Sequence, residues 1–165
     1  HDRVLRENFL TRVLAYRAWQ QVPAEGLSRR ALTEFHSRYK YLLMAHNPLQ
    51  YKNLGKMLGN MADSDPAELG PRYFSELMAA LKKCATRGTH CNVLLHLSGY
   101  LKQSLSAEDK QEMQQIIGQY RQGIVPLVVP LTLLKHHFRL HPDPYIAQQV
   151  YLQPHPENLS LRNAI

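Results

Sequence analysis

Residue pairs that end one helix and begin the next divide this 165-residue chain more clearly than any other feature of its sequence. Asn47-Pro48 and Asp65-Pro66 each end one stretch of helical apolar spacing and begin the next, because Asn and Asp cap helices and Pro is favoured in a first turn. Between such breaks apolar side chains recur every three to four residues, whereas the period-two alternation of β-strands is essentially missing. The sequence therefore predicts an all-α fold.

About seven to eight helices are expected in one compact domain, residues 1–165, with an extended C-terminal tail. Phe9, Val13 and Tyr16 give the first helix, residues 3–21, its helical spacing, and a turn at 23–26 ends it. From about Tyr151 the chain becomes polar and irregular, and we expect it to pack back over the helices. The other helices are predicted after Ser28, Pro48 and Pro66, over about 91–103, from Ser106 to Gly123, over 131–140 and after Pro144.

The composition favours a folded domain that does not cross a membrane. Apolar residues make up 44% of the chain, which is enough to form a core. The longest apolar run, residues 124–134, is too short to span a bilayer. Cys84 and Cys91 do not make a disulfide framework, and with His90 and His96 they lack the tight spacing of zinc sites. We expect reduced thiols, no bound metal and a cytoplasmic location.

Positive charge is concentrated near the start of the chain. Twenty Lys and Arg residues against thirteen Asp and Glu residues give a net charge of +7. Residues 1–60 hold ten basic and four acidic side chains, so +6 of net charge falls in this part. Such asymmetry favours one electropositive side that faces a polyanion such as nucleic acid. A merely solvated basic surface is the alternative.

The first candidate group lies in the helix predicted after Ser28. His36, Arg38 and Lys40 fall within about one turn, and His36 and Lys40 share a side with Arg29 two turns earlier. A row of cations held by buried aromatic residues suits phosphate contacts, because binding releases counterions. An ordinary solvated helix face would show the same pattern. Two further residues of this stretch belong to the candidate nucleic-acid contacts, Arg30 and His46.

The second candidate group follows one stripe of the helix predicted over 91–103. Asn92, His96 and Tyr100 could bond to or stack with an unpaired base. Gly99 costs about 1 kcal/mol relative to Ala inside a helix, so we expect it to permit close approach of a neighbouring helix or a nucleotide. A buried polar network between helices is the equally simple alternative.

A third candidate group lies in the helix predicted over 131–140. Lys135 and Arg139 are one turn apart and flank His136, and Arg162 in the tail could complete a polar patch. The adjacent histidines have no acidic or cysteine partner nearby, so solvated or core histidines are expected rather than a metal site.

Catalytic signatures are absent from the sequence, and we assign no catalytic residue. There is no Gly-rich phosphate loop, no Gly-x-Ser-x-Gly, no His-Glu-x-x-His and no Cys-x-x-Cys. A general base could still occur among the nine histidines, because a base and a nucleophile need only meet in space. A standalone enzyme that uses His36, His46 or His96 is therefore an alternative function, and a defined pocket around one of them would favour it.

A set of short motifs spread over nearly the whole chain resembles the YbgA-like family, a domain of unknown function. The spacing of the motifs, taken together, is specific. They are Phe35-His-x-Arg-x-Lys40, Leu43-x-Ala-His46, Tyr51-x-x-Leu-Gly55, Asn92-Val-Leu-x-His96-x-x-Gly-Tyr100, Tyr120-Arg-x-Gly, Pro126-Leu-x-x-Pro130, Lys135-His136 and Gln149-x-Tyr-Leu-x-Pro-His-Pro-x-x-Leu-x-Leu-Arg-Asn163.

The resemblance implies a role in tRNA modification. Members of the family occur alone, and also as the C-terminal half of a protein whose N-terminal half is similar to thiouracil desulfidases. That half holds a four-iron four-sulfur cluster with three cysteines, and the two-domain form resembles enzymes that remove sulfur from 4-thiouridine in tRNA. By this resemblance the present chain supplies tRNA binding, and the cluster and the chemistry belong to an N-terminal domain in cis. Cys84 and Cys91 do not match the desulfidase motif, so no cofactor is expected in this chain.

A module that docks against the desulfidase half is a further alternative. An exposed apolar patch, rather than a cationic one, would mark such a module.

Overall fold

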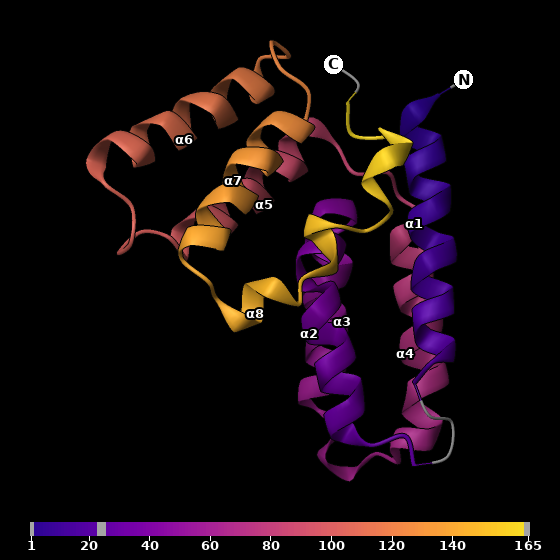
Figure 1. Cartoon of the computed structure of the whole chain (residues 1–165). Helices are drawn as coiled ribbons and strands as arrows, with labels where there is room; N and C mark the ends of the chain where they lie inside the picture. The colour runs from indigo at the N-terminus through magenta and orange to yellow at the C-terminus, as the bar shows by residue number, and fades with distance from the viewer. Residues whose placement is uncertain (1, 23–25, 164–165) are drawn as a thin grey trace.

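Eight α-helices and three short 3-10 helices make up the computed structural model, which describes residues 2–22 and 26–163 (Figure 1). No strand occurs within these ranges, so the all-α prediction is confirmed. Most of the turn predicted at 23–26 lies outside the described residues. The helices are α1 (Arg3–Gln20), α2 (Arg29–His46), α3 (Pro48–Gly59), η1 (Met61–Asp63), α4 (Pro66–Leu81), α5 (Arg87–Gly99), α6 (Ala107–Arg121), α7 (Val128–Leu140), α8 (Pro144–Ala147), η2 (Val150–Leu152) and η3 (Glu157–Leu159).

Side-chain caps fix the helix starts that the sequence predicts. Asn47 Oδ1 accepts a hydrogen bond from the Gln50 amide at 3.2 Å, and Asp65 Oδ1 accepts one from the Ala67 amide at 3.0 Å. These bonds satisfy amides that have no partner inside the helix, so α3 and α4 begin where predicted. Ser28 and Ser106 cap α2 and α6 in the same way.

Two helices begin earlier than predicted. α5 starts at Arg87 rather than near Cys91, because Thr86 and Thr89 cap one another reciprocally, and it ends at Gly99 rather than at 103. α7 starts at Val128 rather than at 131, with Pro130 in its first turn, where a missing amide hydrogen costs nothing. No helix of the described ranges combines the length and the apolar character needed to cross a bilayer.

α2 lies at the centre of the core and contacts α3, α4, α5 and η2. All of its residues from 41 to 46 are buried. Figure 1 shows α1 to α4 running side by side as one group and α5 to α7 forming a second group. The segment after α8 returns between the two groups to α1, which it contacts at Glu7, so the prediction that the tail packs back over the helices is confirmed.

The side of α1 that gives the sequence its helical spacing does not face the core. Phe9, Val13 and Tyr16 are about half exposed, and Val4 and Leu5 continue the exposed stripe; the five range from 45 to 62% exposure. The buried side of α1 instead carries Asn8, Thr11 and Ala15. Periodic spacing thus identified the helix correctly. The residues of α1 that the neighbouring elements cover, however, are small or polar rather than apolar.

Candidate functional site

Residues of the first and second candidate groups meet where α2 packs against α5. Lys40 Nζ lies 5.1 Å from the centre of the Tyr41 ring, and the buried Tyr41 hydroxyl donates to the Tyr100 hydroxyl at 3.1 Å. The Tyr100 ring is 42% exposed and stacks on Tyr145 of α8, with 6.1 Å between centroids. Four residues, two from α2, the residue that follows α5 and one from α8, therefore form one chain of contacts that ends at the surface.

His36 adds a second stacked pair beside Lys40. Its ring is nearly parallel to that of Tyr51, with centroids 5.8 Å apart, and its Nδ1 lies 2.9 Å from the Tyr73 hydroxyl. Burial, followed by the charge of Lys40, lowers the pKa of His36 to about 4, so the imidazole is neutral at neutral pH. We call His36, Lys40, Tyr51, Tyr100 and Tyr145 the tyrosine–lysine face.

The α5 stripe that leads away from Tyr100 is open to solvent. Asn92, His96 and Gly99 are exposed, so a buried polar network does not explain Asn92 and His96. Apart from the adjoining residues and the backbone of its own helix, no described atom lies within 4 Å of the position that a methyl group on Gly99 would take. The expectation that Gly99 permits close approach of a neighbouring helix is therefore wrong.

The remaining cations of α2 do not join this face as one row. Arg30 pairs with Glu34 at 2.7 Å, and Arg29 donates to the Ala62 carbonyl. Arg38 lies over the Phe35 ring at 5.6 Å, on the opposite side of the helix from Lys40.

The third candidate group stays on α7 and the tail. Lys135 forms an ion pair with Glu157, which offsets its charge. His136 and Arg139 are exposed, and an Arg139 amino group lies 3.0 Å from His136 Nδ1.

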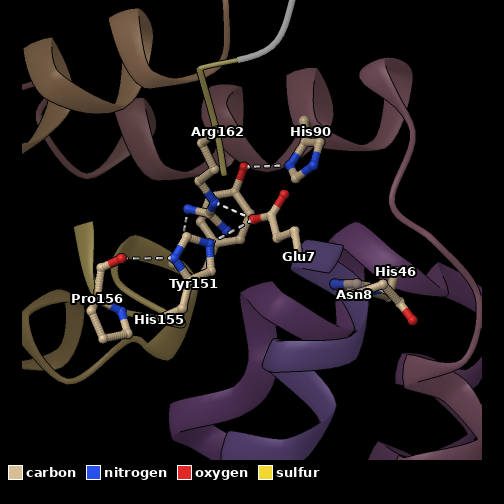
Figure 2. A network of polar contacts seen from close by, with 8 residues as sticks. All are labelled: Glu7, Asn8, His46, His90, Tyr151, His155, Pro156 and Arg162. Carbon is tan, nitrogen blue, oxygen red and sulfur yellow. Dashed lines mark hydrogen bonds and ion pairs between the residues drawn. The ribbon is translucent and has the colours of Figure 1, made fainter. Parts of the chain in front are cut away.

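Two other predicted residues, Arg162 and His46, lie instead in the interior. Figure 2 shows Arg162 beside Glu7 of α1: Arg162 Nε donates to Glu7 Oε1 at 2.6 Å, and His155 Nε2 donates to the same oxygen at 3.1 Å. Arg162 also donates to the Tyr151 carbonyl at 2.7 Å. Burial alone would raise the pKa of Glu7, but the bond from His155 and the charge of Arg162 outweigh it and lower the pKa to about 2.

Two buried histidines face the same interior region. His46 Nδ1 donates to the Lys83 carbonyl at 2.7 Å, and Asn8 lies beside it (Figure 2). His90 Nδ1 lies 2.8 Å from the Tyr151 hydroxyl. Burial lowers the pKa of both rings, that of His90 to about 3, so both are neutral.

A cavity of about 170 Å³ lies between these groups. Glu7, His46, His90 and Arg162 line it together with Arg87, whose guanidinium donates to the Tyr120 carbonyl at 2.7 Å and covers the Tyr120 ring. Of the three histidines considered for catalysis, His46 is the one that lines a cavity; His36 stacks on Tyr51 and His96 faces solvent.

Sequence reasoning missed most of the interior residues. Glu7, Asn8, Arg87 and His90 belong to no local pattern of charge or spacing that marks a site. The one available signal was that Glu7 is the sole acidic residue among the arginines within α1.

Eight helices closed by a returning tail, with an aromatic and cationic face outside and a histidine-lined cavity inside, define a single all-α domain. The chain belongs to the family described as "Protein of unknown function (DUF1722)", which matches residues 40–156. It is 30% identical over 159 residues to "Uncharacterized protein YbgA" of Escherichia coli (strain K12), and the alignment covers 96% of this chain and 94% of that protein. The resemblance to the YbgA-like family is thereby confirmed. No solved structure matches the chain.

Proposed function

We propose that this chain is a cytoplasmic RNA-binding domain that holds tRNA on the tyrosine–lysine face for a 4-thiouridine desulfidase. The observation that carries the proposal is that Lys40 lies over the Tyr41 ring, which bonds to the stacked pair Tyr100–Tyr145, and that its charge acts on His36 of the stacked pair His36–Tyr51. Proteins that bind single-stranded RNA combine a cation for the phosphates with rings on which bases stack. The net positive charge of residues 1–60 is spread over more than one side of the molecule, and it adds a long-range attraction to RNA.

The rings of the face are held in place before any ligand binds. Tyr41 is buried and fixes Tyr100 through its hydroxyl, and His36 is held between Tyr51 and the Tyr73 hydroxyl. Because these side chains lose little rotational freedom on binding, more of the stacking energy remains as affinity.

Desulfidation itself is assigned to an N-terminal domain in cis, outside this chain. The resemblance places an iron–sulfur cluster on three cysteines, whereas this chain has two. Cys91 is buried in the core and Cys84 is half-buried seven residues away. These two thiols therefore do not match the ligand set of a four-iron four-sulfur cluster, and we assign them no part in sulfur removal.

Replacement of Lys40 by Gln and of Tyr100 by Leu should each weaken tRNA binding. Loss of one stacking ring costs about 1–3 kcal/mol, or roughly 5- to 150-fold in affinity. Loss of Lys40 should also reduce the dependence of log affinity on log salt by about 0.7–0.9. Fluorescence anisotropy with labelled tRNA over a salt series measures both effects.

The controls for this experiment are Arg72→Gln on α4 and Lys135→Gln on α7. Both remove one positive charge from an ion pair elsewhere in the structure and should leave affinity nearly unchanged. If Lys40→Gln and Tyr100→Leu bind tRNA as the unsubstituted chain does, the proposal is wrong.

A second candidate function, docking against the desulfidase-like domain, is favoured by the exposed stripe of α1. Leu5, Phe9, Val13 and Tyr16 follow one another at helical spacing and are all about half exposed. Helical geometry places Arg6 and Arg17 along one side of this stripe and Arg12 along the other. A second copy of the chain would bring these arginines together, so the charge favours a partner surface rimmed by carboxylates.

Phe9→Ser should abolish most of the binding to a separately produced desulfidase-like domain while leaving the fold intact. Phe9 is 62% exposed, so its loss should change the free energy of unfolding by about 0.5 kcal/mol or less. Loss of a central aromatic anchor typically weakens an interface at least about tenfold. Titration calorimetry measures the affinity, and Leu49→Ser, an equally exposed change on α3, is the matched control. A concentration-dependent dimer that Phe9→Ser dissolves would identify a second copy as the partner instead.

A further inference from the structure

The cavity that Glu7, His46 and His90 line shares no residue with the tyrosine–lysine face, and it is built from distant parts of the chain. α1 contributes Glu7, α2 contributes His46, α5 contributes Arg87 and His90, and the tail contributes Arg162. Its volume of about 170 Å³ is far more than one water needs and less than a drug-sized ligand occupies. The cavity therefore has room for one small ligand.

Two polar atoms at this cavity lack a partner within the described residues. His46 is 7% exposed and His90 is 8% exposed, and each ring uses its Nδ1 in a bond to the protein. Neither Nε2 makes a hydrogen bond to any described residue, although both side chains line the cavity. Since His46 donates through Nδ1 and is neutral, its Nε2 is an acceptor. Neither Nε2 is among the fully buried side-chain atoms that lack a partner, so both can be reached from the cavity and can bond to a ligand group there.

The charged groups of the lining leave one positive charge without compensation. Glu7 is ionised and bound to Arg162, which accounts for one pair. Arg87 has no carboxylate within ion-pair distance in the described parts of the chain. Its guanidinium is fixed on Tyr120 by a bond to the carbonyl and by the ring, 5.0 Å away. Arg87 also begins α5, so the positive end of that helix dipole lies at the same place.

We propose that this cavity binds a phosphate monoester, with the phosphate on Arg87 and an adjoining hydroxyl donating to His46 Nε2. A rigid guanidinium matches the geometry of phosphate oxygens, and the uncompensated positive charge of the lining attracts an anion. The same chemistry is found on a free sugar phosphate and on the 5′ end of an RNA chain. The site is separate from the tyrosine–lysine face and does not depend on it.

Ribose 5-phosphate and inorganic phosphate are the probes that test the site. At ten times its dissociation constant, ribose 5-phosphate should raise the Tm by about 3–6 °C. Arg87→Gln should weaken its binding in titration calorimetry by about tenfold or more, because a charge-assisted bond is lost. Arg121→Gln removes an exposed charge from the end of α6 and is the matched control. Circular dichroism verifies that both variants are folded.

Absence of ribose 5-phosphate binding, or binding that Arg87→Gln leaves unchanged, would overturn the proposal. Short RNAs with a 5′-phosphate or a 5′-hydroxyl then identify the source of the phosphate. A preference for the 5′-phosphate that Arg87→Gln removes and Lys40→Gln retains places an RNA end in the cavity. Equal binding of the two RNAs, with ribose 5-phosphate still bound, assigns the cavity to a free phosphate ester. Because the sugar phosphate is measured without RNA, these results are independent of the proposed RNA binding.

Discussion

Acidification from pH 7 to pH 4 should strongly destabilise this domain, because two buried histidines and one half-buried histidine are neutral in the native state. Burial lowers the pKa of His36 to about 4, that of His90 to about 3, and that of His46 in the same direction. In the unfolded chain these rings take up protons near pH 6.5. Between pH 6.5 and about 3 the unfolded state therefore binds more protons than the native state, and stability falls as the pH falls.

The expected loss is large compared with the stability of a domain. Each histidine contributes at most about 1.4 kcal/mol per pH unit within its window, and the three windows overlap below pH 6. Glu7 adds to the loss at lower pH: its native pKa of about 2 lies below its ordinary value of 4.5, so its contribution is present above 4.5 and disappears towards pH 2. Domains of this size are stable by about 5–15 kcal/mol, so a loss of several kcal/mol should bring the domain much closer to unfolding near pH 4.

Urea unfolding at a series of pH values between 7 and 4 measures this effect. The slope of the unfolding free energy against pH gives the number of protons taken up. His90→Gln should reduce that number by about one, whatever its effect on stability at pH 7. His96→Gln, on the exposed side of α5, is the matched control. A stability that does not change between pH 6.5 and pH 5 would show that these histidines are not held neutral.

Arg162→Met should destabilise the domain by about 3–5 kcal/mol at neutral pH. The substitution leaves the Glu7 carboxylate in the interior with its principal cation removed; the two side chains are only 8 and 17% exposed. It also removes the donor to the Tyr151 carbonyl and the cation that covers the Tyr151 ring. Chemical denaturation followed by circular dichroism measures the change.

A double substitution separates the ion pair from general loss of packing. Glu7→Gln together with Arg162→Met should destabilise the domain by less than the sum of the single changes, because no unpaired charge remains. Arg30→Met breaks the exposed pair with Glu34 and should change the stability far less than Arg162→Met, because both partners are solvated. Equal effects of Arg162→Met and Arg30→Met would contradict the importance of burial.

Local features of the sequence were sufficient to locate the helices. Asn47-Pro48, Asp65-Pro66 and Ser28 act within one helical turn, so their effect does not depend on the rest of the fold. The start of α5 was misplaced because Thr86 and Thr89 form a cap without an acidic residue, a weaker signal than Ser followed by Glu or Asp.

The meeting of residues far apart in the chain could not be predicted in the same way. His36, Lys40 and Tyr100 were identified as candidates, but their relation depends on how α2 packs against α5. Spacing also predicted that α1 is a helix without showing which side would be covered. Glu7 and Arg162 are 155 positions apart, and nothing near either residue indicates the other.

This ion pair between the two ends of the chain has a consequence for folding during synthesis. Glu7 leaves the ribosome about 150 residues before His155 and Arg162. Because synthesis proceeds at about 5–20 residues per second, the Glu7 carboxylate has no partner from the tail for on the order of ten seconds or more. The contacts between α1 and the tail therefore form only after Arg162 has been synthesised, and a nascent chain that is interrupted before Arg162 would still carry the Glu7 carboxylate without this partner.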